Sequence, residues 1–210
     1  MLRILIADDH EMIKEGLKHF INGLLSHVVI DTACDGDSAI EKIKKHEYNL
    51  IILDVNMPGT DSFGLVSNIR IIMPNAKILI YSMNAENVYA KRYLQLGANG
   101  YVNKTASPIE LATAINAVLS KDRYFSADLI EIITEEAFGK KANNPFDKLS
   151  SREFEILQHL INGESLRVIS NTFNLHTSTV STHKARIFEK LKCKNIMEVS
   201  ELAKVYKVIP

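Results

Sequence analysis

Net charge is the first thing this sequence lacks, because 25 lysines and arginines balance 25 aspartates and glutamates over 210 residues. An excess of basic residues usually marks a nucleic-acid binder, so neutrality argues against one if the chain is a single unit. Cysteine is also scarce, since only Cys34 and Cys193 are present. They lie far apart and in no metal-ligand spacing, so we expect reduced thiols and a cytoplasmic protein.

Long hydrophobic runs are absent as well. No stretch of about 18 apolar residues occurs, which excludes a membrane-spanning helix of ordinary length. The N-terminal segment reaches Asp8 and Asp9 too early for a signal peptide, and we expect none. Hydrophobic residues nevertheless make up 46% of the chain. That fraction can bury a sizeable core and argues against intrinsic disorder.

Residues 1–122 alternate between two hydrophobic periods. Short β-branched runs, typical of strands, recur between segments of helical length. This alternation predicts an α/β domain with a doubly wound, five-stranded parallel sheet and helices on both faces. The expected strands cover residues 3–7, 28–33, 49–54, 76–81 and 99–103, and the expected helices cover 10–22, 37–46, 62–72, 85–96 and 108–119.

The pattern changes after residue 122. We expect residues 123–147 to be a linker with one helix, 127–138, and a flexible connector, 139–145, rich in Gly, Lys, Asn and Pro. Residues 148–210 predict a small all-α domain. Its first helix has a capping box, Ser150 with Glu153, and ends near residue 161. The others cover 166–173, 177–191 and 197–207, and the short turn before 177 is typical of a helix-turn-helix.

The charge divides at the same connector. Residues 1–144 carry 15 basic and 18 acidic side chains, whereas residues 145–210 carry 10 basic and 7 acidic ones. The helical part is therefore the basic one. Neutrality of the whole chain no longer argues against nucleic-acid binding by that part.

Polar side chains follow four of the five expected strands. Asp8 and Asp9 follow the first strand, and Asp54 ends the third. Carboxyl ends of parallel strands meet at one edge, so three carboxylates should converge there and would need a cation or raised pKa values. Oxygen ligands of this kind suit Mg²⁺. Ser82 and Lys104, from the fourth and fifth strands, add a hydroxyl and an ammonium, which together describe a site for an aspartyl-phosphate.

Four parts of the sequence carry a family resemblance: ADDH (7–10), LDVNMPG (53–59), Ser82 and GANGYVNK (97–104). Through them, residues 1–122 resemble the receiver domain of bacterial response regulators. The resemblance implies that a sensor histidine kinase phosphorylates Asp54. It implies a Mg²⁺ site at Asp8 and Asp9, with Asp9, Asp54 and the backbone carbonyl of Asn56 as ligands.

The resemblance also implies a switch. Ser82 and Lys104 would contact the phosphoryl group, and Tyr101 would turn inward; alternatively, Tyr101 is a half-buried strand aromatic without a switching role. Two residues depart from the family. Met83 stands where many receivers have a small residue, and it could shield the phosphoryl group. Thr105 stands where many receivers have a proline that is preceded by a cis peptide bond. A cis bond before a residue other than proline costs ~3 kcal/mol, so we do not assume one here.

Residues 148–207 resemble the LuxR-type helix-turn-helix, on LSSREFEIL (149–157), NGES (162–165), VIS (168–170) and STVSTH (178–183). With the receiver-like part, the chain resembles the NarL/FixJ class of transcriptional regulators. The resemblance implies a DNA-binding protein rather than an enzyme. Phosphorylation would control its DNA binding by changing domain docking or dimerisation.

The helix over 177–191 should carry the DNA-binding surface. Val180, Ile187 and Leu191 recur at helical spacing and should face the core, bordered by His183 as a hydrogen-bonded packing residue. In a helix-turn-helix the opposite face enters the major groove, while basic side chains contact phosphates. The candidate DNA contacts are Ser178, Thr179, Ser181, Thr182, Lys184, Ala185, Arg186 and Lys190.

Other departures concern this helix. Ser181 replaces a residue that is often basic in the family, and Ala185 occupies another frequent contact position, so binding could be weaker or the DNA site unusual. His176 stands where a capping serine is common, so we expect Thr177 to cap the helix instead.

The last expected helix carries a second apolar stripe, formed by Val199, Leu202, Ala203 and Tyr206. Core packing alone would explain it. In the family this helix pairs two subunits, so the resemblance implies a homodimer when the chain is phosphorylated or bound to DNA.

Two other functions fit parts of the sequence. A Mg²⁺-dependent phosphohydrolase with an aspartyl-phosphate intermediate would commonly have a second acid two residues after its nucleophile, where this chain has Asn56. Such an enzyme also leaves the helix-turn-helix unexplained. A DNA-binding regulator controlled by a partner or ligand, without phosphorylation, leaves the intact acidic pocket unexplained.

Overall fold

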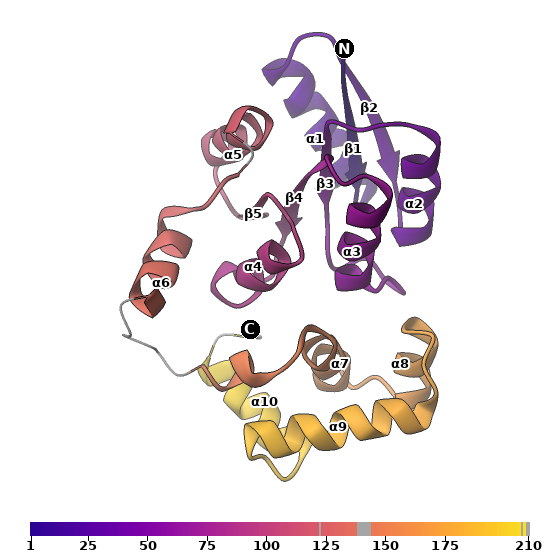
Figure 1. Cartoon of the computed structure of the whole chain (residues 1–210), viewed down its shortest axis with the longest axis vertical. Helices are drawn as coiled ribbons and strands as arrows, with labels where there is room; N and C mark the ends of the chain where they lie inside the picture. Colours follow the sequence, from indigo (N-terminus) through magenta and orange to yellow (C-terminus); the bar gives the residue numbers. More distant parts are fainter. Residues whose placement is uncertain (122, 138–143, 207, 209–210) are drawn as a thin grey trace. The chain divides into compact units, whose positions relative to one another are not determined.

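The computed structural model describes residues 1–121, 123–137, 144–206 and 208. The chain divides into two compact units, Met1–Ile130 and Glu131–Pro210 (Figure 1). The first unit contains one parallel sheet in the order β2-β1-β3-β4-β5, and the described part of the second is helical, which confirms the predicted fold class. The strands are β1 (Leu2–Ala7), β2 (Val28–Ala33), β3 (Leu50–Leu53), β4 (Lys77–Ser82) and β5 (Gly100–Asn103).

Helices cover both faces of the sheet (Figure 1). Alternate strand residues point to opposite faces, and Ile4 of β1 packs in one core with Leu17 of α1 and Ile115 of α5. On the other face, the ring of Phe63 in α3 lies 4.4 Å from that of Tyr93 in α4. The helices of this unit are α1 (Glu11–Leu24), α2 (Gly36–Lys45), α3 (Ser62–Ile72), α4 (Glu86–Gln95) and α5 (Pro108–Lys121), and α6 (Ala127–Ala137) begins in it.

The strand register brings the carboxyl ends of the strands into line. Ala7 pairs with Leu53, and Ser82 pairs with Asn103. β3 ends one residue earlier than predicted, but the N–H of Asp54 still donates to the carbonyl of Ala7 at 2.8 Å. The residues that follow β1, β3, β4 and β5 therefore meet at one edge of the sheet, as in other open parallel sheets.

In the helical unit, α7 begins at the capping box that the sequence predicts. The Ser150 hydroxyl accepts from the backbone N–H of Glu153, whose carboxylate accepts from the N–H of Ser150 at 2.8 Å. These bonds satisfy two donors at the start of α7. The helices are α7 (Ser151–Ile161), α8 (Leu166–Thr172), α9 (Thr177–Leu191) and α10 (Ile196–Val205).

A short 3-10 helix, η1 (Pro145–Lys148), was not predicted. Asn144 caps it by accepting from the N–H of Phe146, whose side chain is fully buried and lies edge-on to the ring of Tyr206 at 6.1 Å. Burial of Phe146 fixes a segment whose composition indicated a connector. Phe138 and residues 139–143, also part of the predicted linker, lie outside the described residues.

The inner face of α9 matches its hydrophobic pattern. Val180, Ile187 and Leu191 are buried, as predicted. His183 packs beside them, but its buried Nδ1 has no hydrogen-bond partner among the residues that the structure describes, so the expected hydrogen bond is not seen at that atom. The prediction for Thr177 is wrong: His176 is the N-cap residue and makes no side-chain cap bond, whereas Thr177 is helical, with its hydroxyl 3.4 Å from that of Ser170.

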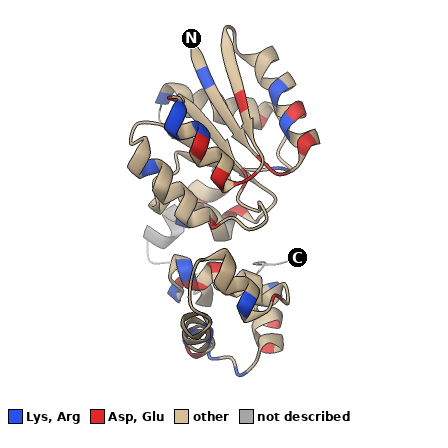
Figure 2. Cartoon of the chain, turned by 90° about the vertical axis from the view of Figure 1, so that its right-hand side faces the viewer, with Lys and Arg blue, Asp and Glu red and all other residues tan. Residues whose placement is uncertain are grey.

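Charged residues of both signs occur on both units (Figure 2). The opposite net charges of the two parts of the sequence are therefore modest excesses rather than uniformly acidic or basic surfaces. Within the described ranges, every helix is too short or too polar to cross a membrane.

Candidate functional site

Asp8, Asp54 and Lys104 meet at the carboxyl edge of the sheet. The ammonium of Lys104 donates to Oδ2 of Asp8 at 2.6 Å and to Oδ2 of Asp54 at 2.7 Å. Both carboxylates are almost fully buried, with side chains 2% exposed. Burial lowers the pKa of Lys104, but its bonds to Asp54 and Asp8 outweigh that effect and raise its pKa above the ordinary value. Lys104 therefore remains a cation between two carboxylates at neutral pH.

Asp9 completes the acidic group from the mouth of the site. Its Oδ1 atom is buried and accepts no hydrogen bond from the described residues. The same oxygen lies 2.9 Å from Nδ1 of His10, and a bound cation would further offset the desolvation cost of this buried atom. Single ligand atoms of Asp8, Asp9, His10 and Asp54 lie within 4.8 Å of one another, so the donor set fits a divalent cation.

The backbone of Asn56 contacts Asp54, the candidate phosphoacceptor, and its side chain contacts the end of β4. Its N–H donates to Oδ1 of Asp54 at 3.1 Å, and its amide nitrogen donates to the Ser82 hydroxyl at 3.2 Å. The side-chain amides of Asn56 and Asn84 also exchange hydrogen bonds at 3.0 and 3.3 Å. We call this reciprocal pair, Asn56 with Asn84, the amide bridge. It joins the loops that follow β3 and β4.

Tyr101 is fully buried, rather than half-buried, and points inward. Its hydroxyl donates to the carbonyl of Asn84 at 2.9 Å. Burial raises the pKa of Tyr101 far above the ordinary value, so the ring stays neutral. Ser82 is fully buried as well and accepts from the N–H of Asn84 at 3.2 Å. Ser82, Asn84 and Tyr101 thus form one connected polar group.

The two departures from the receiver pattern lie beside this group. Met83 is 61% exposed, so its side chain extends from the rim into solvent. Thr105 donates to the Asn103 side chain through its N–H at 2.9 Å and its hydroxyl at 2.7 Å. The peptide bond between Lys104 and Thr105 is trans, as assumed.

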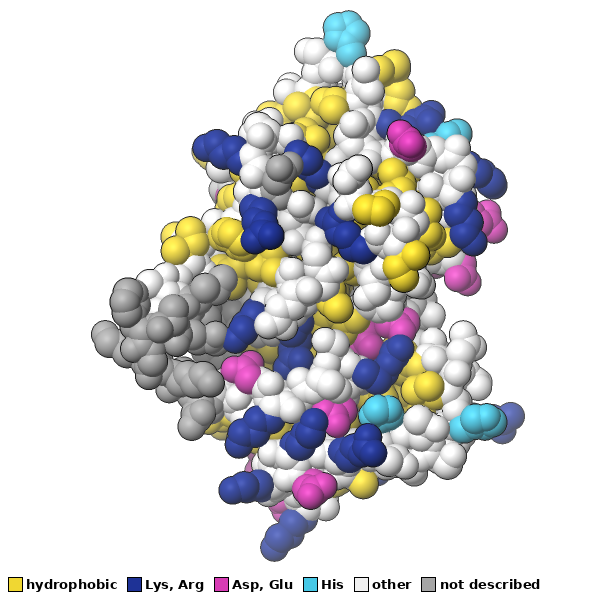
Figure 3. Space-filling model, viewed as in Figure 1, with side chains coloured by type: hydrophobic (Ala, Val, Ile, Leu, Met, Phe, Trp, Pro, Cys, Tyr) yellow, Lys and Arg dark blue, Asp and Glu magenta, His cyan; other side chains and the backbone are white. Residues whose placement is uncertain are grey.

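The outer face of α9 is polar and free of large apolar side chains. Ser178, Ser181 and Thr182 are exposed near its N-terminus, and Ala185 and Arg186 follow them on the exposed side. Basic side chains gather over α9 on the face shown in Figure 3. Small polar residues flanked by cations suit a helix that approaches a phosphate-lined groove.

Two family models match the chain. One, described as the response regulator receiver domain, covers residues 4–116, and the other, described as bacterial regulatory proteins of the luxR family, covers residues 147–203. The Fimbriae Z protein of Salmonella typhimurium is 31% identical over 206 residues, which are 98% of each chain. Response regulator GacA of Pseudomonas viridiflava is 30% identical, over 97% of this chain and 95% of the relative. The chain is a response regulator with a LuxR-type DNA-binding domain.

A solved structure agrees with this fold. RcsB of Salmonella enterica, bound to the promoter rprA with the phosphomimetic BeF₃⁻, has a TM-score of 0.76 at 22% identity, covering 97% of this chain and 99% of that chain. That likeness concerns the fold. The receiver-domain and luxR-family matches make this response regulator a phosphorylation-controlled DNA-binding protein of a family of transcription regulators, and not an enzyme.

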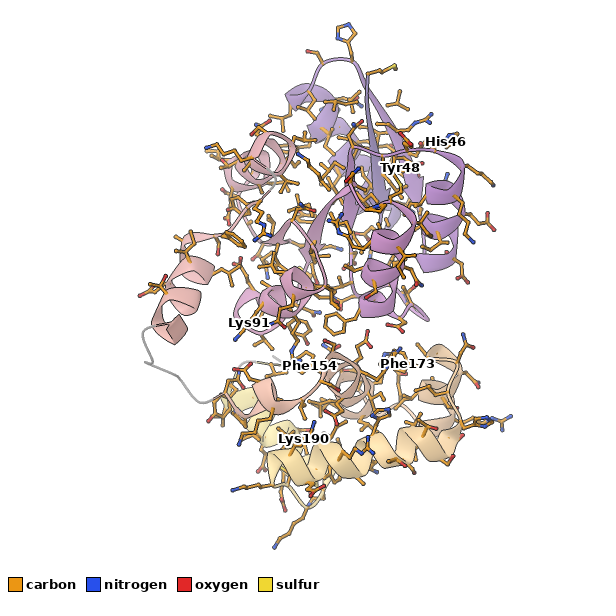
Figure 4. The ribbon with its side chains drawn as sticks, viewed as in Figure 1. His46, Tyr48, Lys91, Phe154, Phe173 and Lys190 are labelled. Carbon is orange, nitrogen blue, oxygen red and sulfur yellow. The ribbon has the colours of Figure 1, made fainter. Side chains whose placement is uncertain are left out.

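Lys190 of the response regulator has a partner that its sequence did not reveal. Its ammonium donates to Oε2 of Glu153 at 2.6 Å, and the side chain extends from α9 toward α7 (Figure 4). Burial raises the pKa of Glu153, but hydrogen bonds from Lys190 and Ser150 outweigh that effect and lower it. A phosphate would therefore compete with Glu153 for the ammonium of Lys190. Lys184, another candidate, lies over the ring of Phe188 at 5.6 Å.

The stripe on α10 that was assigned to dimerisation belongs partly to the core. Val199 and Ala203 are fully buried, and Leu202 and Tyr206 are half-buried. A fully buried side chain has no surface to offer a second subunit, so the assignment of Val199 and Ala203 is corrected. The exposed face of α10 instead consists of Met197, Glu201, Lys204 and Val205.

Two residues of the site were not predicted as members. His10 follows the acid pair directly and belongs to the ADDH segment, but no role was assigned to it. Asn84 lies two residues after Ser82, and its role depends on the loop conformation that brings it to Asn56. Spacing along the sequence does not reveal such a contact.

Proposed function

We propose that Asp54 is the phosphoacceptor of this response regulator and that a sensor histidine kinase supplies the phosphoryl group. The contact between Lys104 and Asp54 carries the proposal. Phosphorylation adds a charge of about −1.5 to −2 and three acceptor oxygens at neutral pH. Lys104 would neutralise part of that charge, and the N–H of Asn56 already donates to Asp54.

Asp9, Asp54 and the backbone carbonyl of Asn56, with Asp8 beside them, would hold Mg²⁺. When bound, the cation supplies electrostatic stabilisation of the phosphoryl oxygens. The buried Oδ1 of Asp9, which accepts no hydrogen bond from the described residues, supports this role. Asp8 contributes indirectly as well, because its Oδ2 binds Lys104 and so helps to hold the ammonium beside Asp54.

The polar group of Ser82, Asn84 and Tyr101 would transmit the change. A phosphoryl group on Asp54 would compete for the Ser82 hydroxyl, which now accepts from Asn56 and Asn84. Movement of Asn84 would alter the carbonyl that accepts from Tyr101. A local change in charge would thus reach the face formed by β4, α4 and β5.

The outer face of α9 would enter the major groove, with Ser178, Thr179, Ser181, Thr182 and Ala185 nearest the bases. Lys184 and Arg186 would contact phosphates, and Lys190 would join them in competition with Glu153. We propose a homodimer on DNA that uses the exposed face of α10, and a cytoplasmic location, where a kinase could reach the receiver domain.

Mass mapping of the phosphorylated residue tests the proposal. The full chain is incubated with acetyl phosphate and Mg²⁺, and the acyl phosphate is trapped by borohydride reduction. The modification is expected at Asp54, and it should disappear in Asp54→Asn. Modification at Asp8 or Asp9 instead would overturn the assignment.

A further inference from the structure

The segment that precedes α6 runs along the edge of the sheet. Tyr124 pairs with Gly100 of β5 in an isolated parallel bridge, and its N–H donates to the carbonyl of Asn99 at 2.9 Å. Glycine permits this approach, because a Cβ atom at position 100 would lie only 3.1 Å from Cβ of Tyr124. Leu129, in the first turn of α6, is buried. The start of α6 is therefore docked on the first unit, which ends at Ile130.

Glu86, the first residue of α4, brings its carboxyl group to the same place. Hydrogen bonding from Ser126 favours the ionised form of this carboxyl. The Ser126 hydroxyl also accepts from the N–H of Leu129 at 3.1 Å, which satisfies one donor at the start of α6. Oε1 of Glu86 is buried and accepts no hydrogen bond from the described residues, so a negative charge on it is costly. Glu86 and Ser126 therefore join the starts of α4 and α6.

The charges that act on Glu86 are all of one sign. Burial raises the pKa of Glu86, and the carboxylates of Glu110 in α5 and Asp128 in α6 raise it further. Tyr124 donates to Oε1 of Glu110 at 3.2 Å. Burial and the charge of Glu110 raise the pKa of Tyr124 to about 12, so this phenol is neutral, as is Tyr101 of β5. Within the described part of the chain, no cation offsets the charge of Glu86, and its surroundings favour a bound proton.

We propose that Glu86 makes the docking of α6 sensitive to protons, so that acid fastens the start of this helix to the first unit and a rise in pH loosens it. Docking raises the pKa of this carboxyl. Its contribution is therefore fully favourable below the undocked value, near 4.5, and is lost as the pH rises through the docked value. Ionised Glu86 repels Glu110 and Asp128, whereas the protonated form does not. The response needs no phosphoryl group on Asp54, so it is a second input to the regulator.

Amide hydrogen exchange of the full chain, followed by ¹⁵N NMR, tests the proposal. The N–H groups of Tyr124 and Leu129 report docking, because both are hydrogen-bonded in the docked segment. Exchange rates are corrected for the intrinsic effect of pH and compared with those of core amides in β1. Lowering the pH from about 8 to about 5 should then increase the protection of both groups several-fold in wild-type protein.

Glu86→Gln keeps the shape of the side chain without its charge, so protection should be high throughout and independent of pH. Glu131→Gln is the matched control, because Glu131 is exposed on α6, and it should respond like wild-type protein. The response should also persist in Asp54→Asn, which separates it from phosphorylation. Protection that does not change with pH in wild-type protein, a response that survives in Glu86→Gln, or one that is lost in Asp54→Asn would overturn the inference.

Discussion

Lys104 places its ammonium 2.7 Å from the carboxylate of Asp54. The same ammonium binds Asp8 at 2.6 Å, so one cation compensates two buried carboxylates from different strands. Removing one partner of a buried charged group leaves the others uncompensated, and the cost typically exceeds the net stabilisation that the group provides. Lys104 therefore stabilises the receiver domain before it assists phosphorylation.

Lys104→Met tests that role. We expect the free energy of unfolding at pH 7 to fall by about 3 kcal/mol, because Asp8 and Asp54 would repel each other without a buried cation. Denaturant unfolding of the full chain at pH 7, followed by circular dichroism, measures the loss, and an unchanged free energy of unfolding would contradict the role. The control is Lys44→Met, because Lys44 is exposed. Lys77→Met would not serve, because Lys77 donates to the carbonyl of Leu119.

The amide bridge predicts a rate effect. Asn84→Ala removes one of the two side-chain amides of the bridge and opens a path for water to Asp54. Phosphorylation by acetyl phosphate and loss of the phosphoryl group should therefore both accelerate several-fold. Quantifying phosphorylated protein on a phosphate-affinity gel over time checks this. The exposed Asn75→Ala should behave like wild-type protein. Unchanged rates in Asn84→Ala would show that the bridge does not limit access.

The pair of Glu153 and Lys190 predicts how the helical unit responds to pH. The pKa of Glu153 is lowered in the folded state. A lowered carboxyl pKa contributes stability that is present above the unfolded pKa, near 4.5, and that is lost as the pH falls through the folded value. The stability that this ion pair contributes should therefore be lost at the acid end of the pH range.

Glu153→Gln should reduce stability at pH 7 by about 1 kcal/mol, a value discounted because Lys190 is partly exposed. It should also flatten the dependence of stability on pH below 4.5. Thermal unfolding across that range measures the slope, with the exposed Glu189→Gln as the control. An unchanged slope in Glu153→Gln would contradict the assigned pKa direction.

Arg186 and Lys190 should differ in their effects on DNA binding. Arg186 is exposed on α9, so Arg186→Ala should weaken binding to all sequences alike and reduce the dependence of log K on log salt by about 1. Lys190→Met should mainly lower stability, because Lys190 binds Glu153. Fluorescence anisotropy with labelled DNA at several salt concentrations distinguishes them. An equal loss of salt dependence in Lys190→Met would show that Lys190 leaves Glu153 on DNA.

Periodicity and strand-end chemistry were sufficient to predict much of this molecule. The five strands, the capping box at Ser150 and the meeting of Asp8, Asp54 and Lys104 all follow from local rules, because parallel strands align their carboxyl ends whatever the loops do. The inner stripe of α9 was equally predictable, since helical spacing fixes which side chains share a face.

Other features depend on contacts between segments that are distant in the sequence. Helical spacing groups Val199 with Ala203 but does not say whether their shared face meets the core or a second subunit. Lys190 looks like a solvated cation until α7 places Glu153 beside it. Phe146 orders a segment whose composition favours a flexible chain, because burying an aromatic ring outweighs that local preference.

The central claim is that phosphorylation of Asp54 controls DNA binding by α9. The most direct measurement is the affinity of the full chain for a bound genomic DNA fragment, with and without BeF₃⁻ and Mg²⁺, for wild-type protein and Asp54→Asn. We expect BeF₃⁻ to change the affinity of wild-type protein at least tenfold and to leave that of Asp54→Asn unchanged. An affinity that is the same in all four samples, or an equal response of Asp54→Asn, would contradict the account.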